Sequence, residues 1–192
     1  LDGVRQAVTM TQTSVIGVSL TDGAVLWKFP FLNKGGGPTP AVAGETIIVS
    51  DAMEGTTGFT AFRRDGAWTT ESRWHTKDAG MYISTPVVIG DTLFGLSSRQ
   101  SGQFFALDAQ TGRTLWLGQP REAANTAIVK AGRLLFYLND DAELIVANSS
   151  RTRFEPVKRY MVADSATWAQ PLISGNRLFV KDVSSLTLWT VE

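Results

Sequence analysis

Short apolar runs alternate with turn-forming residues along the whole chain. Residues 86–97, for example, read PVVIGDTLFGLS, in which two apolar runs flank a Gly-Asp pair. Runs of this length predict β-strands, and Gly-Asp, Asp-Gly and Thr-Gly pairs predict the turns between them. No segment carries a convincing helical period, so we expect an all-β protein.

The pattern of strands and turns recurs along the chain. The apolar runs that open each unit start, at spacings of 46, 41 and 44 residues, at Pro40, Pro86, Ala127 and Pro171. The aromatic residues that close each unit follow, at spacings of 47, 42 and 44 residues, at Trp27, Trp74, Trp116 and Tyr160. Both series lengthen and shorten together, so they mark one repeated unit. A period of about 40–50 residues built from short strands predicts a β-propeller.

Each complete unit reads as four strands. The expected units are a partial one at 4–31, complete ones at 40–74, 86–117 and 127–161, and a partial one at 171–192. The first partial unit is expected to hold three strands, the three complete units twelve, and the last partial unit three, which gives eighteen strands. A closed ring of four blades would need sixteen strands, so we expect an open arc of about four blades.

Three glycines are predicted to form the turns that precede the outer strand of a unit: Gly23, Gly66 and Gly112. Trp27 and Trp116 each stand four residues after such a glycine, where the outer strand returns. A large aromatic in this place can fill the wedge between neighbouring sheets and contribute about 2–3 kcal/mol by its burial. We therefore interpret the four recurring aromatic residues, including Trp74 and Tyr160, as structural.

One phrase in the third unit resembles a known repeat. The stretch ALDAQTGRTLW at 106–116 closely matches the A-L-D-x-x-T-G-x-x-x-W phrase of the pyrroloquinoline-quinone-type β-propeller repeat. The match is partial in Pro40–Trp74 and weakest in Ala127–Tyr160, where Tyr replaces Trp and no Thr-Gly pair is present. The resemblance implies a seven- or eight-bladed ring, of which this arc would be part.

The family that carries this repeat includes both enzymes and proteins that bind no quinone. Its alcohol and sugar dehydrogenases use a vicinal cysteine pair, a bound Ca²⁺ and a catalytic Asp, whereas this sequence has no Cys and no ligand set that we can place. The chain is more similar to the non-catalytic branch, which includes the propeller lipoprotein of the outer-membrane barrel assembly machinery. The resemblance implies a periplasmic or secreted setting.

The composition argues against nucleic-acid binding and against a membrane-spanning helix. The 192 residues carry 18 basic and 18 acidic side chains and a net charge of +0, so no basic stripe for nucleic acid is expected. No apolar run reaches the ~18 residues of a membrane helix. The chain opens inside a strand-like pattern without an export signal, which we interpret as the start of a fragment.

Candidate chemical sites are sparse. His75 is the single histidine and is expected to be a solvated residue on an outer strand. The acidic stretch Asp140, Asp141 and Glu143 could hold Ca²⁺, but a hairpin loop is the favoured interpretation. The GGGP sequence at 35–38 is expected to be a flexible connection and not a phosphate loop, because no helix follows it. We predict no catalytic residues, no metal and no cofactor.

The best candidates for binding lie at one mouth of the propeller's axial channel. In the geometry that the resemblance implies, the segments ahead of the inner strands and the loops after the second strands share this face. Its candidate residues are Met81, Tyr82, Arg99, Asp140, Trp168 and Lys181, and the same segments also contain Asp51, Glu54, Gln100 and Asn125. Tyr, Trp and Arg are favoured at binding hot spots.

We therefore expect a non-catalytic scaffold whose partner is another protein or the rest of the propeller. Two alternatives remain open at this stage. The chain could be part of a quinone-dependent dehydrogenase, or it could be a carbohydrate-binding propeller that uses Tyr82 and Trp168.

Overall fold

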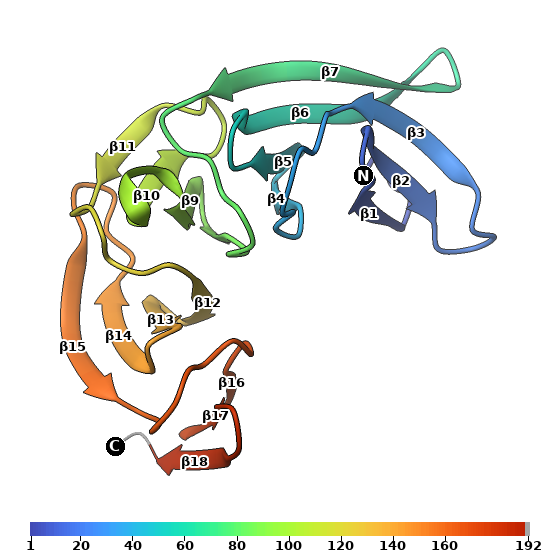
Figure 1. Cartoon of the computed structure of the whole chain (residues 1–192). Helices are drawn as coiled ribbons and strands as arrows, with labels where there is room; N and C mark the ends of the chain where they lie inside the picture. Colours follow the sequence, from blue (N-terminus) through green and yellow to red (C-terminus); the bar gives the residue numbers. More distant parts are fainter. Residues whose placement is uncertain (191–192) are drawn as a thin grey trace.

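The computed structural model describes residues 1–190, which form an open arc of five antiparallel β-sheets (Figure 1). The first and last sheets lie at the two ends of the arc, and the described residues do not close into a ring. The one helical element among them is a single 3₁₀ turn, Arg99–Ser101. The predicted all-β arc is confirmed. Val191 and Glu192, which the last expected unit included, lie outside the described residues.

Three sheets have four strands each, and in each sheet every strand pairs with its neighbour in sequence. The second sheet contains β4 (Ala41–Ala43), β5 (Thr46–Asp51), β6 (Gly55–Arg64) and β7 (Ala67–Thr76). The third contains β8 (Val87–Ile89), β9 (Thr92–Ser97), β10 (Gln103–Asp108) and β11 (Thr114–Leu117). The fourth contains β12 (Thr126–Ala131), β13 (Leu134–Asn139), β14 (Glu143–Asn148) and β15 (Glu155–Met161).

The two end sheets have three strands each. The first contains β1 (Gln6–Met10), β2 (Ser14–Ser19) and β3 (Val25–Pro30), and the fifth contains β16 (Leu172–Ser174), β17 (Arg177–Lys181) and β18 (Leu186–Thr190). The described residues thus contain the eighteen strands that the sequence predicts. Within this part of the chain, β1 and β18 each have one strand edge without a pairing partner.

The predicted turn glycines all adopt backbone angles that favour glycine. Asp65 and Gly66 have φ angles of 53° and 82°, the two positive values of a type I′ hairpin turn between β6 and β7. Gly23 and Gly112 have φ angles of 75° and 71°. The amide of Gly112 donates to the carbonyl of Asp108 at 2.8 Å, which closes the turn before β11.

A tryptophan from one sheet packs against the next sheet. Trp74 on β7 lies opposite Gly58 on β6, and a Cβ on Gly58 would lie 2.2 Å from the indole ring. On the other side, a Cβ on Gly112 of the third sheet would lie 2.4 Å from the same ring. The indole Nε1–H donates to the carbonyl of Ala109 at 3.2 Å. Two glycines and one carbonyl therefore fix this ring between neighbouring sheets.

Tyr160 departs from the predicted packing. Trp27, Trp74 and Trp116 are at most 8% exposed, whereas Tyr160 is 44% exposed. Its partner across β14 and β15 is Leu144, where Trp74 has Gly58 as its partner. Tyr160 lines an open apolar pocket between the fourth and fifth sheets together with Leu178 and Trp189, so it borders the wedge between these sheets but does not fill it as predicted.

Candidate interaction face

The segments ahead of the inner strands and the loops after the second strands meet at one end of the sheets. The amide of Ser98 donates to the carbonyl of Gly80 at 2.8 Å, which places Arg99 beside the segment that carries Tyr82. The amide of Asp140 donates to the carbonyl of Asn125 at 3.0 Å, and the amide of Thr167 donates to the carbonyl of Asp140 at 3.2 Å. We call this end the mouth face and define it by Tyr82, Arg99, Asn125, Asp140 and Trp168.

Two aromatic side chains project from the mouth face. Trp168 is 60% exposed and Tyr82 is 52% exposed. The segment that carries Tyr82 is held to the interior of the second sheet, because the amide of Met81 donates to the buried hydroxyl of Ser50 on β5 at 2.9 Å. Exposed rings on such a restrained backbone can contact a partner with little further loss of conformational freedom.

The glycine-rich stretch at 35–38 helps to restrain Tyr82. The amide of Gly37 donates to the carbonyl of Tyr82 at 2.7 Å, and a Cβ on Gly36 would lie 2.1 Å from that oxygen. The amide of Lys34 donates to the carboxylate of Asp51 at 2.9 Å. The stretch is thus a connection between sheets, as predicted, but it is tied to the mouth face at several points.

Asp51 organises this connection from the end of β5. Its Oδ1 accepts the amides of Met53 at 2.8 Å and Glu54 at 3.0 Å. Burial raises the pKa of Asp51, but the backbone amides of Glu54, Met53 and Lys34 outweigh it and hold the pKa below its ordinary value. The carboxylate therefore has a structural role.

Met81 does not belong to the exposed surface. It is 1% exposed and packs in a core cluster with Ala79, Leu93 and Phe105. Its side chain is buried while that of the next residue, Tyr82, is exposed. The prediction of Met81 as a binding residue is corrected accordingly.

Arg99 and Lys181 occupy different environments. Arg99 is half-buried, and its Nε is enclosed without a hydrogen-bond partner in the described part of the chain. Lys181 is exposed, but it is the last residue of β17 and not a loop residue as predicted. Its ammonium group donates to the carbonyl of the next residue, Asp182.

The acidic stretch after β13 forms a turn. The Oδ1 of Asp140 accepts the amide of Asn125 at 2.9 Å, and the Oδ1 of Asp141 accepts the amide of Glu143 at 3.1 Å. Glu143 forms an ion pair with Arg159 at 2.8 Å. These bonds give each of the three carboxylates a partner within a turn, the interpretation that the sequence favours.

His75 lies on β7 with an exposed side chain, as expected. Its Nδ1 is 3.0 Å from the hydroxyl of Thr57. Within residues 1–190, no three His, Cys, Asp or Glu side chains lie together in a way that could hold a metal ion. Over the same residues, no helix is long and apolar enough to span a membrane.

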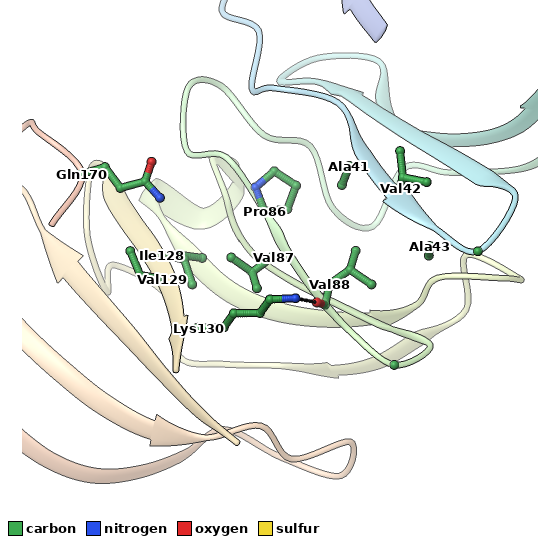
Figure 2. A pocket seen from close by; sticks show the side chains of 12 residues that line it. Ala41, Val42, Ala43, Pro86, Val87, Val88, Ile128, Val129, Lys130 and Gln170 are labelled. Carbon is green, nitrogen blue, oxygen red and sulfur yellow. Dashed lines mark hydrogen bonds between the residues drawn. The ribbon is translucent and has the colours of Figure 1, made fainter. Parts of the chain in front are cut away.

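The inner strands form a hollow of about 580 Å³ on the concave side of the arc (Figure 2). Its wall consists mostly of backbone and small apolar side chains from β4, β8 and β12. Lys130 is the one charged residue in this wall, and its Nζ donates to the carbonyl of Val88 at 3.2 Å. Nothing in this wall resembles a catalytic arrangement, since acid–base chemistry requires a titratable pair within reach of a substrate.

A smaller pocket of about 130 Å³ lies at the mouth end of the fourth sheet. Its walls are formed by Ile83, Thr85, Asn125, Thr126, Ala127, Ile128, Trp168 and Gln170. It shares Ile128 and Gln170 with the larger hollow, so the two spaces are neighbours. Thr126 and Gln170 could not be singled out as pocket residues from the sequence, because neither position differs in pattern from an ordinary strand or loop residue.

Three comparisons relate the chain to known proteins. Residues 1–118 match the model of the family described as "Outer membrane protein assembly factor BamB". The crystal structure of BamB from Moraxella catarrhalis superposes with a TM-score of 0.70 at 16% sequence identity. The superposition covers 98% of this chain and 58% of that protein, so the chain spans little more than half of its length. No curated protein matches the sequence significantly.

Proposed function

Since the chain belongs to the family of the outer membrane protein assembly factor BamB, we propose that it is a non-catalytic propeller scaffold whose mouth face holds another protein. The observation that carries the proposal is the pair of exposed aromatic residues, Tyr82 and Trp168, on backbone that buried hydrogen bonds restrain. The name of the family supports a role in assembly outside the cytoplasm.

The composition of the mouth face favours a protein as the partner. Aromatic residues and Arg dominate the binding energy of protein interfaces, and they act best at positions that exclude water. Tyr82 and Arg99 lie on neighbouring segments, because the amide of Ser98 bonds to Gly80. Trp168 follows Thr167, which is bonded to Asp140. The partner can thus contact several anchors on one surface.

A triple substitution tests the proposal. We expect the variant with Tyr82, Arg99 and Trp168 changed to Ala to release the protein that co-purifies with the wild-type protein from its native cells. Changing Arg113 and Arg133 to Ala is the matched control, because both side chains are exposed and lie in turns at the opposite end of the sheets. Retention of every co-purifying protein by the triple variant, with an unchanged thermal unfolding curve, would refute the proposal.

A further inference from the structure

In each of the first four sheets, the pairing between the last two strands shifts register at one point. The residue of the outer strand at this shift is, in the order of the sheets, Trp27, Trp74, Trp116 and Lys158. Lys158, and not Tyr160, is therefore the structural equivalent of the three tryptophans. The fourth sheet carries an amine on a flexible stem where the other three sheets carry an indole.

The three tryptophans fill the wedge between their own sheet and the next one. Trp27 packs edge-on against Phe59 of the second sheet, with the ring centroids 5.8 Å apart. The indole Nε1–H of Trp116 donates to the carbonyl of Ser150 in the fourth sheet at 2.9 Å. By the same register, Lys158 lies at the wedge between the fourth and fifth sheets, and it lines a pocket there.

This pocket has a volume of about 440 Å³ and an apolar lining. Its buried part belongs to the core between the two sheets and consists of Phe136, Leu144, Val162 and Leu178. Four further apolar side chains of the lining are 42–66% exposed: Val157, Tyr160, Met161 and Trp189. They leave the pocket open to solvent along β15, which lies on the outer side of the arc (Figure 1).

Trp189 provides a restrained aromatic ring in this lining. Its Nε1–H donates to the carbonyl of Val162 at 3.0 Å, which ties β18 to the residue that follows β15. Aromatic rings attract one another at centroid separations of about 4.5–7 Å. A second ring that enters the pocket therefore finds a partner that is already held in place.

Lys158 is the one charged residue among the described residues that line the pocket. It is exposed, its Nζ lies 5.5 Å from the centroid of the Tyr160 ring, and it forms no salt bridge within residues 1–190. The next residue, Arg159, is by contrast paired with Glu143 and Glu122. The pocket thus combines apolar surface with an unpaired positive charge, which favours a negatively charged partner.

The openness of the pocket indicates what kind of molecule enters it. Sites for free small molecules bury about 70–90% of the ligand surface, whereas the exposed side chains along β15 leave this wedge open on one side. A side chain that projects from a larger molecule needs no such enclosure, because the rest of its partner covers the opening. The equivalent wedges each hold an indole, so the space suits an aromatic ring.

We propose that the wedge between the fourth and fifth sheets binds a Trp side chain from an acidic segment of another protein. The ring packs against Trp189 and Leu178, and an Asp or Glu next to it in the segment pairs with Lys158. This contact goes beyond the mouth-face function, because it lies on the outer side of the arc and uses different strands.

Nuclear magnetic resonance on the ¹⁵N-labelled 192-residue chain tests the contact. The probe is the acetylated and amidated peptide Asp-Trp-Asp, and the matched probes are Lys-Trp-Lys and Asp-Ala-Asp with the same end groups. We expect Asp-Trp-Asp to shift the indole signal of Trp189, with half-saturation at about 1–10 mM, and to leave that of the enclosed Trp116 unchanged. Lys-Trp-Lys should bind at least about threefold more weakly, and Asp-Ala-Asp should cause no shift.

Two variants of Lys158 separate the roles of space and charge. Lys158→Trp introduces the residue of the other three sheets, so it should fill the wedge and abolish the response to Asp-Trp-Asp. Lys158→Met keeps an unbranched stem and removes the charge, so it should bind Asp-Trp-Asp about two- to fivefold more weakly than the wild type does. Lys28→Met, at an exposed position on β3, is the matched control and should bind every probe as the wild type does.

Several results would overturn the proposal. They are an unchanged Trp189 signal with every peptide, an equal response to Asp-Ala-Asp, and undiminished binding by Lys158→Trp. Equal binding of Lys-Trp-Lys and Asp-Trp-Asp would show that the partner segment is not acidic. Shifts produced by octanoate and by none of the peptides would also contradict the proposal and would indicate a site for a small amphiphilic acid.

Discussion

Replacing Gly58 by Ala tests the packing that joins the second and third sheets. The new methyl carbon would lie 2.2 Å from the Trp74 ring, whereas carbon atoms at ease stand about 3.5–4.0 Å apart. The ring cannot move freely away, because it approaches Gly112 on its other side and donates to Ala109. Overpacking of about 1–3 kcal/mol and a weakened hydrogen bond of about 1 kcal/mol give an expected loss of about 2–4 kcal/mol.

Thermal and urea unfolding followed by circular dichroism measure this loss. At about 2–4 °C per kcal/mol for a chain of this size, the melting temperature should fall by about 5–15 °C. Gly35→Ala is the control, since a Cβ there has no atom within 4 Å and the change should stay within about 0.5 kcal/mol. In a Trp74→Leu background, Gly58→Ala should cost at least about 1 kcal/mol less than in the wild type. Unfolding of Gly58→Ala that matches the Gly35→Ala control, or strict additivity with Trp74→Leu, would refute the reasoning.

Three further predictions concern stability. Arg151→Ala removes the 2.9 Å ion pair with Asp108 and should cost about 1 kcal/mol at pH 7. Burial raises the pKa of Asp108, but hydrogen bonds from Arg151 and Thr111 hold it below its ordinary value. The difference between wild type and Arg151→Ala should therefore shrink as pH falls below about 4, and an unchanged difference in urea melts at pH 3 would contradict this. Asn139→Leu should raise the melting temperature, because both side-chain polar atoms of Asn139 are buried without partners in the described chain; a lower value would indicate unseen bonds. Tyr160→Ala should lower the free energy of unfolding by less than about 1 kcal/mol, and Trp116→Ala should lower it by about 3–5 kcal/mol in the same assay. Equal losses would contradict the inference that the exposed Tyr160 contributes less to packing than the buried Trp116.

The fold could be predicted because its determinants are local and repeated. The predicted turn glycines with positive φ, such as Gly112, stand one or two residues before a strand, and the alternation within each unit marks its strands. The recurrence of these signals at similar spacings then identifies the propeller without knowledge of any long-range contact.

Packing between sheets could not be predicted in the same way. That Met81 is buried and Tyr82 is exposed follows from packing of Met81 against Leu93 and Phe105, which come later in the sequence. Tyr160 stays half-exposed at an open pocket between the fourth and fifth sheets, although its spacing fits the repeat. These outcomes depend on contacts between segments that the periodic pattern does not specify.

The mouth face was predicted in part. The structure brings Tyr82 close to Arg99 and Asp140 close to Trp168 through backbone hydrogen bonds between loops. The pocket beside Trp168 was not foreseen, since its wall includes Asn125, whose side-chain oxygen accepts from Ser84 and whose backbone amide donates to Asp140. A polar residue directly before a strand is too common to signal such a site.

Site-specific photo-crosslinking in native cells tests the central claim most directly. A photoreactive phenylalanine analogue is placed at Tyr82, at Trp168 and, as a control, at the exposed Leu20 in the turn between β2 and β3, at the opposite end of the sheets. The scaffold function predicts that one and the same protein is captured from both mouth-face positions and not from position 20. Capture of that protein from position 20 alone, or of no protein from positions 82 and 168, would contradict it.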